Sequence, residues 1–426
     1  MCIGRLLIRN RVRFGAVSQR IEESVGQSVG KVLKNSLIRK SIFLAVFAGG
    51  IFFLAGCWDR IEINDLAIVT ATGIDKSEDG QVVLSLEIFI PKNMTGGEGG
   101  NGLGGGEQQT TMVTYHKGRN IAEALSKLQA EMPRKIYWGS CKIFIFGDAV
   151  AKDGIQEHVD FLLRHPQPRE RAFILVSRGK AKKILDTKAT LERFSSETLR
   201  EIANKKHGMS VTLQELDTML TSKDQNVVLP YLKILKEKSD GKKTQYTVLE
   251  GTVLFKKDRM IGTISESTTR GLLWITDKLK EYTVTFEIEE GNGHISIFPV
   301  KTEVNLTPRI QNGEWKMIVD VHTEGTIVQN GTTLDLDDRK SERKINKVYR
   351  DKVEERIRKA IEAAQEHGLD VVGYGREFHQ KYPQQWKKVE GRWEEVFPEV
   401  KTEFHIHANI RRQGYINEPI KTKGQK

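Results

Sequence analysis

The first half of the chain alternates between the hydrophobic spacing of strands and that of helices. Residues 66–72 form an apolar, β-branched run, and residues 83–90 alternate so that one face is continuously apolar. Glu78-Asp79-Gly80 predicts a hairpin turn between them. Further elements are expected as strands at 141–146 and 172–177 and as helices at 121–128, 155–163 and from 181 onward. This βαβαβα order indicates a sheet with helices packed on it.

The second half of the chain segregates strands from helices. Its expected elements are strands at 282–288, 294–306 and 316–327, a long amphipathic helix over 345–364 and a last strand at 400–411. Asn312-Gly313 predicts a hairpin turn, and Gly368 predicts the left-handed end of the long helix. We therefore expect an α+β fold with an N-terminal βαβαβα-type domain and a C-terminal antiparallel sheet packed with a long helix.

These patterns divide the chain into five parts. The expected bounds are 1–56 for a leader, 57–198 for an N-terminal mixed α/β domain, 199–285 for a middle domain, 286–414 for the C-terminal sheet with its long helix, and 415–426 for a tail. The middle domain is less regular, although Thr212 and Glu215 have the spacing of a capping box that begins a helix.

A glycine-rich segment interrupts the N-terminal domain, with eight glycines among the eleven residues from Gly96 to Gly106. A phosphate-binding loop would need a helix directly after it, but residues 107–111 have strand character. We expect a mobile loop instead, because such a segment cannot bury enough apolar surface to offset the entropy lost on ordering.

Near the N-terminus, a basic segment precedes a short apolar run that ends in Leu54-Ala55-Gly56-Cys57. As a helix, residues 41–56 would span only about 24 Å, whereas a membrane-spanning helix needs about 20 apolar residues. The order of basic segment, apolar core, small residues and cysteine instead resembles a bacterial lipoprotein signal peptide. This resemblance implies cleavage between Gly56 and Cys57, a diacylglyceryl group on Cys57, and a mature chain held at the outer face of a membrane.

The net charge is concentrated in this leader. The whole chain carries 67 basic and 56 acidic residues, a net charge of +11, and residues 1–56 hold nine of the basic and two of the acidic residues. The remaining 370 residues therefore carry 58 basic and 54 acidic residues, a net charge of +4. No basic stripe interleaved with aromatic residues stands out there, so no nucleic-acid partner is expected.

Two histidines near the C-terminus have the spacing of metal ligands. His405 and His407 alternate on a predicted strand, so both imidazoles face one side, near Glu403. Three such groups could bind a metal ion, but no fourth ligand is visible in the sequence. We therefore interpret them as solvent-facing side chains at a strand edge, and no metal site is predicted.

Other reactive residues have structural interpretations. Cys141 adjoins an apolar run and is expected in the core, not as a catalytic thiol. Asp335, Asp337 and Asp338 lack the glycine and distal glutamate of a calcium loop and favour a helix N-terminus. His379 is expected to hold the packing of Phe378 and Tyr382 through hydrogen bonds. With no Ser-His-Asp order or nucleophile elbow, we predict no catalytic residue.

Four sequence blocks together resemble one family. They are Gly56-Cys57-Trp58-Asp59-Arg60-Ile61-Glu62-Ile63-Asn64-Asp65-Leu66-Ala67, Gly271-Leu272-Leu273-Trp274-Ile275-Thr276, Gly375-Arg376-Glu377-Phe378-His379-Gln380-Lys381-Tyr382-Pro383, and Ile410-Arg411-Arg412-Gln413-Gly414. In this order the chain resembles the Ger(x)C family of spore germination proteins, the C subunits of nutrient germinant receptors. The resemblance covers essentially the whole mature chain and marks these blocks as structural or interaction motifs.

The resemblance implies a lipoprotein on the outer face of the spore inner membrane. It also implies two membrane-embedded partners, the A and B subunits of the receptor, and neither enzymatic activity nor a cofactor. Two alternatives stay open: an envelope-associated lipoprotein enzyme such as a hydrolase, and a solute-binding lipoprotein. The strongly β second half argues against the two similar lobes of a solute-binding protein. A polar, carboxylate-lined cleft would favour the enzyme.

Overall fold

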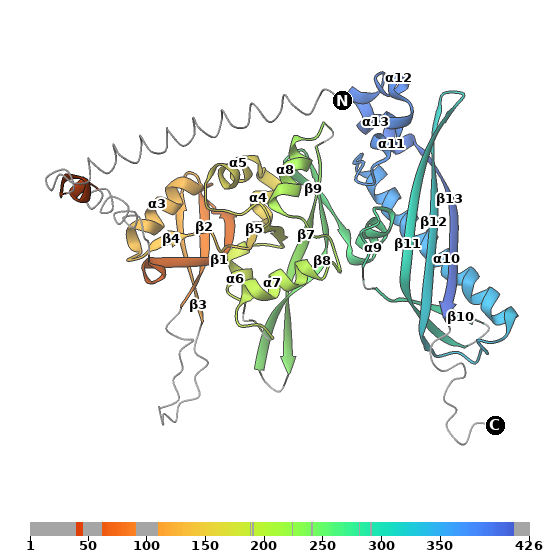
Figure 1. Cartoon of the computed structure of the whole chain (residues 1–426). Coiled ribbons are helices and arrows are strands. Elements are labelled where there is room, and N and C mark those ends of the chain that lie inside the picture. The colour runs from red at the N-terminus through yellow and green to blue at the C-terminus, as the bar shows by residue number, and fades with distance from the viewer. Residues whose placement is uncertain are drawn as a thin grey trace, which may run out of the picture. The chain divides into compact units, whose positions relative to one another are not determined.

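The computed structural model describes residues 40–45, 62–90, 110–187, 189, 191–223, 225–239, 242–280, 282–289 and 292–412 (Figure 1). Two compact units divide the chain between Asp65 and Leu66. In the first, residues 40–45 are helical and Ile63–Asp65 form a 3-10 turn, η2. The second contains two sheets and the helices packed on them. No helix among the described residues is long and apolar enough to cross a membrane.

The first sheet has nine strands in the described residues, in the order β3-β2-β1-β5-β6-β7-β8-β9, with β4 paired to β1. Their bounds are β1 Leu66–Lys76, β2 Val82–Phe89, β3 Thr111–Gly118, β4 Lys135–Tyr137, β5 Ile143–Gly147, β6 Phe173–Ser177, β7 Asn226–Ser239, β8 Lys242–Lys256 and β9 Arg259–Ser265. The central strands β1, β5, β6 and β7 run parallel, and antiparallel pairs flank them on both sides. The predicted hairpin of β1 and β2 is confirmed.

Helices cover both faces of this sheet. They are α3 Ile121–Glu131, α4 Asp148–Asp153, α5 Gln156–Arg164, α6 Ala181–Leu185, α7 Ser195–Asn204 and α8 Leu213–Thr221. On β5, Ile143 and Ile145 pack with residues of α6 and α7, whereas Phe144 and Phe146 belong to the core on the opposite face. Because both faces are buried, β5 is a continuous apolar run, as central parallel strands usually are.

The strand β2 differs from its predicted pattern, because its polar face is buried as well. Ser85 and Glu87 are 0% and 1% exposed. The carboxylate of Glu87 accepts hydrogen bonds from the hydroxyl of Thr70 at 2.7 Å and from that of Ser195, on α7, at 2.6 Å. The alternating pattern of residues 83–90 assigned the apolar and polar side chains to the correct faces of β2. It did not reveal that α7 covers the polar face.

Strands from the expected middle domain continue the first sheet. β7 pairs in parallel with β6 through Val176–Tyr231 and Ser177–Leu232, and β8 and β9 extend the sheet beyond it. The expected boundary at residue 198 falls inside α7. The capping box at Thr212 is confirmed: its hydroxyl accepts from the backbone N–H of Glu215, and the carboxylate of Glu215 accepts from the backbone N–H of Thr212. The division into three domains stays a prediction.

The second sheet has the order β10-β11-β12-β13. Its strands are β10 Val284–Ile288, β11 Gly293–Gln311, β12 Glu314–Asn330 and β13 Lys401–Arg412. The first three form the expected antiparallel meander, and Asn312 and Gly313 turn with φ of +52° and +83°. However, β13 pairs in parallel with β12, which corrects the expectation of a wholly antiparallel sheet. The intervening helices carry the chain back along the sheet, so β13 starts at the same end as β12.

The long helix α10, Arg339–Glu366, packs on one face of the second sheet (Figure 1). Asp338 caps its first turn by accepting a hydrogen bond from the N–H of Ser341 at 2.9 Å, as expected for a helix N-terminus. Gly368 follows its end with φ of +63°, as predicted. Short elements then lead to β13: α11 Tyr374–Lys381, α12 Pro383–Trp386, η5 Glu390–Arg392, α13 Trp393–Val396 and η6 Phe397–Glu399.

Candidate functional site

The motif Gly271-Leu272-Leu273-Trp274 lies on α9, Glu266–Ile275, which packs against α10. A Cβ atom at Gly271 would lie 2.1 Å from the backbone oxygen of Arg356, so only glycine lets the two helices approach this closely. Leu272 and Trp274 are 1% and 0% exposed. The geometry of this motif is that of a helix–helix contact in the core.

The motif Gly375-Arg376-Glu377-Phe378 lies on α11, whose first turn surrounds the half-buried carboxylate of Asp370. That carboxylate accepts hydrogen bonds from the backbone N–H groups of Gly373, Tyr374 and Gly375 and from the indole N–H of Trp393. Burial raises the pKa of Asp370, while these four donors act against the rise. The carboxylate thus fixes the start of α11 to the segment that carries Trp393.

Aromatic rings complete the surroundings of Asp370. Phe378 is fully buried, with its ring centroid 4.7 Å from that of Trp315 and 5.7 Å from that of Trp393. Gly375 leaves room for Trp386 and Trp393, because a Cβ there would lie within 2.9 Å of both rings. Two of the four motif residues, Gly375 and Phe378, therefore build the core.

The other two residues of this motif reach the surface. The side chain of Arg376 is 71% exposed, and its guanidinium lies 3.1 Å from the carboxylate of Glu377. His379 is also exposed, and its ring stacks on that of Trp386 with centroids 5.8 Å apart. Its aromatic contact is therefore with Trp386. Arg376 is the motif residue best placed to meet another molecule.

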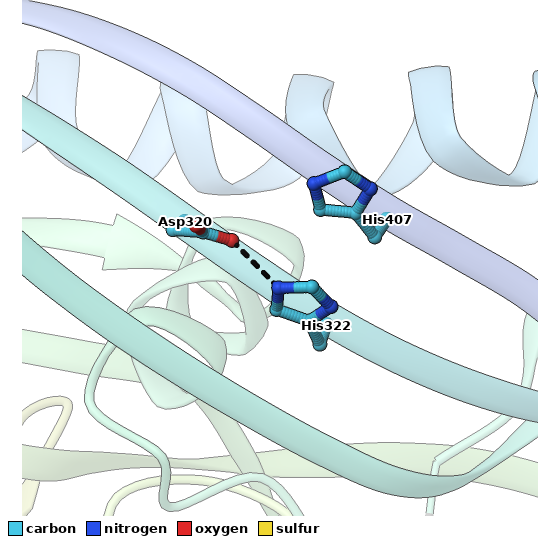
Figure 2. Close-up of side chains that lie close together, drawn as sticks. All are labelled: Asp320, His322 and His407. Atoms are coloured by element: carbon cyan, nitrogen blue, oxygen red, sulfur yellow. Dashed lines mark ion pairs between the residues drawn. The ribbon is translucent and has the colours of Figure 1, made fainter.

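Figure 2 shows three polar side chains that meet on the face of the second sheet opposite α10: Asp320, His322 and His407. Asp320 and His322 alternate along β12, and His407 lies beside His322 in the parallel register with β13. Nε2 of His322 is 3.0 Å from Oδ1 of Asp320, and the two imidazole rings stack with centroids 4.5 Å apart and planes 14° apart.

The sequence had grouped His405, His407 and Glu403, and the structure keeps His405 beside Glu403 but places His407 against another residue. His405 lies 2.9 Å from Glu403, and the two form an ion pair if His405 is protonated. Glu403 also pairs with Lys316 across the strands, and both contacts lower its pKa. His407 instead stacks on His322, a residue that the sequence analysis did not consider. β13 is the edge strand of its sheet, as expected.

Reactive groups in the first sheet have structural partners. Cys141 is fully buried, its thiol donates to the carbonyl oxygen of Ile143 at 3.3 Å, and burial raises its pKa to about 12. Asp75 accepts hydrogen bonds from the backbone N–H groups of Ala181 and Lys182 at 2.7 and 2.9 Å. Burial raises the pKa of Asp75 against these donors. Although Asp75 lines a hollow of about 580 Å³, its oxygens are committed to the start of α6.

Two family models match this chain. Residues 59–234 match the spore germination protein N-terminal domain, and residues 250–414 match the C-terminal domain described as spore germination B3/GerAC like. The chain belongs to the Ger(x)C family of spore germination proteins. The family inferred from the four sequence blocks is thereby confirmed.

Curated relatives of this Ger(x)C protein match it over most of their length. Spore germination protein KC of Bacillus subtilis (strain 168) is 26% identical over 90% of this chain and 98% of its own. The putative spore germination protein YfkR of the same strain is 28% identical over 86% of this chain and 95% of its own. These matches give the chain a germination-related role. Neither name refers to an enzyme.

A solved structure supports the fold. The crystal structure of the GerBC protein matches with a TM-score of 0.52 and 16% identity, over 80% of this chain and 97% of that chain. At this level of identity the likeness concerns the fold alone. It agrees with the α+β class predicted from the sequence.

Several predicted site residues of this Ger(x)C protein lie outside the described residues: Gly56, Cys57, Trp58, Asp59, the segment from Gly96 to Gly106, and the tail at 415–426. Asn64 and Asp65 are described, and both are exposed in the turn η2. The backbone N–H of Asp65 donates to the carbonyl oxygen of Glu62 at 3.0 Å. The lipidation and cleavage sites therefore stay predictions.

Sequence reasoning missed two groups of residues. Asp370 and Trp393 complete the core around α11, and the short spacing from Asp370 to Gly373 is typical of a side chain that caps a turn. Asp320 and His322 are spaced two residues apart, like His405 and His407, and this spacing can be read from the sequence. The sequence does not reveal that β12 and β13 pair in parallel, which brings the two pairs of residues together.

Proposed function

We propose that this chain is the lipid-anchored C subunit of a spore nutrient germinant receptor. It acts by protein–protein interaction with the membrane-embedded A and B subunits, at the outer face of the spore inner membrane. The observation that carries the proposal is the family match over residues 59–234 and 250–414, which begins two residues after the predicted lipidation site.

The anchor is the first part of this proposal to test. Replacing the nucleophilic cysteine in Cys57→Ala should block attachment of the diacylglyceryl group and leave an unprocessed precursor. Labelled fatty acid should enter the wild-type chain and not the variant, while Cys141→Ala, a change at a buried thiol, should label normally. Equal labelling of the Cys57→Ala chain would exclude this anchor.

The receptor role is tested in spores that lack the chain. Their response to one class of nutrient should be lost while other triggers still work, and the membrane partners should accumulate less because a binding surface is left uncovered. Germination and partner abundance, measured in the same spores, decide the outcome. A null strain that germinates normally with every nutrient, and a purified chain that turns over an envelope substrate, would favour the enzyme alternative.

The motif residues fall into two groups, one that supports the fold and one that is able to contact a partner. Gly271, Trp274 and Phe378 are buried and support the fold, whereas Arg376 is exposed and able to contact a partner. Arg376→Glu should leave the amount of protein unchanged and reduce co-purification of the membrane partners. The matched control is Lys183→Glu, a charge reversal at an exposed position of α6. Equal loss of partners with both variants would reject a specific role for Arg376.

A further inference from the structure

The outer face of β12 and β13 brings together three side chains of the types that bind transition metals. One oxygen of Asp320 and one nitrogen each of His322 and His407 all lie within 4.8 Å of one another. In a tetrahedral zinc site with bonds of about 2.0–2.1 Å, neighbouring ligand atoms lie about 3.3 Å apart. The side chain of His322 is 54% exposed, so small rotations toward a shared ion meet little resistance.

The carboxylate of Asp320 gives an independent sign of a missing partner. Its Oδ1 atom is shielded from solvent and makes no hydrogen bond to any described residue. The 3.0 Å contact with Nε2 of His322 is short enough for an ion pair but does not have hydrogen-bond geometry. A shielded carboxylate oxygen without a hydrogen bond is costly, and native proteins rarely keep one without a reason. A cation bound between Asp320 and His322 would satisfy it.

The arrangement of the strands provides a three-sided site. Residues at i and i+2 of β12 present Asp320 and His322 on the same face, and the register with β13 places His407 directly beside His322. The stacked rings lie nearly parallel, so their nitrogen-bearing edges are side by side in Figure 2. The fourth ligand position of a tetrahedral site would point away from the sheet, on the face that α10 does not cover.

We propose that Asp320, His322 and His407 bind one divalent transition-metal ion, of which Zn²⁺ suits the donors best. Two imidazoles and one carboxylate are a common ligand set for zinc, and they leave a position open for water or for a group of another molecule. This departs from the sequence expectation of no metal, because the fold supplies Asp320 and His322 in place of Glu403 and His405. The proposal does not depend on the receptor role.

Titration of the full-length chain with Zn²⁺ tests this site. The purified chain is kept in detergent, stripped with a chelator and titrated by calorimetry, with Co²⁺ absorption spectra as a second readout of coordination. The wild type should bind about one equivalent, and His322→Gln, His407→Gln and Asp320→Asn should each weaken binding at least about tenfold. Circular dichroism checks that each variant is folded.

His405→Gln is the matched control, because it removes a histidine from the same face of β13 that the proposed site does not use. Its Zn²⁺ affinity and Co²⁺ spectrum should equal those of the wild type. The proposal is overturned if the wild type shows no saturable binding, if the folded site variants bind as the wild type does, or if His405→Gln weakens binding as strongly as His407→Gln. His322→Gln and His407→Gln each remove one proposed ligand. If one of these variants misfolds, Zn²⁺ binding by the other still tests the site.

Discussion

Two aspartates in the C-terminal half of the chain differ in how their carboxylates are hydrogen-bonded: Asp370, just before α11, and Asp320, on β12. Asp370 is half-buried beside aromatic rings, and four N–H groups donate to its carboxylate. Asp320 lies on the outer face of β12, and one of its oxygens is shielded without a hydrogen bond to the described residues. A carboxylate whose acceptor sites are filled by the chain holds a fold together, whereas one left unfilled is available to a ligand.

Local geometry explains this difference. At the start of a helix several backbone N–H groups lack partners and converge, so one carboxylate can accept from all of them. In a strand the backbone N–H groups are used by the sheet, and an outward side chain finds only other side chains. Asp370 precedes α11, whereas Asp320 sits within a paired strand, which decides their roles.

Removing the carboxylate of Asp370 should have the largest effect on stability. Asp370→Ala leaves several buried N–H donors without an acceptor, which should lower the free energy of unfolding by about 3–5 kcal/mol. Urea unfolding followed by tryptophan fluorescence measures this change, because Trp393 donates to Asp370 and Trp315 packs nearby. Asp370→Asn keeps one acceptor oxygen and should cost less, and a loss under about 1 kcal/mol for Asp370→Ala would contradict this role.

A smaller loss is expected where α9 meets α10. The added Cβ in Gly271→Ala would overlap the backbone oxygen of Arg356, forcing the helices apart and costing about 1–3 kcal/mol. Gly391→Ala is the control, since no atom of the described residues lies within 4 Å of the Cβ position there. Thermal unfolding of the two variants should differ clearly, and equal melting temperatures would mean that α9 and α10 are not held this closely.

The exposed carboxylate of Glu355 on α10 shows how little a surface ion pair contributes to stability. Glu355 lies 2.8 Å from Lys352 and 2.7 Å from Lys359, and hydrogen bonds from these lysines lower its pKa from 4.5 to about 2. Its side chain is 42% exposed, so solvent screening limits the contribution to about 0.5 kcal/mol. Because the pKa of Glu355 is lower in the folded chain than in the unfolded one, its charge stabilises the fold at pH values above the unfolded pKa. This contribution is lost as the pH falls through the folded pKa.

Glu355→Gln should therefore lower stability slightly at neutral pH. The difference from the wild type should vanish as the pH falls from 4.5 to about 2, the interval between the ordinary and folded pKa values of Glu355. Urea unfolding at a series of pH values measures it. A difference that persists at pH 2 would have to come from packing and not from charge.

The smallest change in stability is expected for Asp320 in the absence of metal. Asp320→Asn changes a carboxylate whose Oδ1 has no hydrogen bond to the described residues, so metal-free unfolding should stay within about 0.5 kcal/mol of the wild type. Unfolding measured with and without Zn²⁺ sharpens the comparison, because bound metal should stabilise the wild type more than the Asp320→Asn variant, which binds it more weakly. A large loss without metal would make Asp320 a structural carboxylate like Asp370.

The apolar patterns were sufficient to predict several elements and their ends. The continuous run of β5, the capping box at Thr212, and the left-handed residue Gly368 all depend on neighbours close in sequence. The same holds for the antiparallel meander of β10 to β12, whose turn residues select their own conformation. Family membership followed from short blocks in order, and the family models bear it out.

Tertiary structure alone decided which faces are covered and which distant residues meet. Glu87 is polar and alternates with apolar residues, yet α7 buries it because Ser195 and Ser196 supply the hydrogen bonds it needs. His407 meets His322 and Asp320 because the helices between them return the chain parallel to β12. Spacing along a strand fixes a side chain's face, but its partners across the sheet depend on register, which is set only when the whole layer packs.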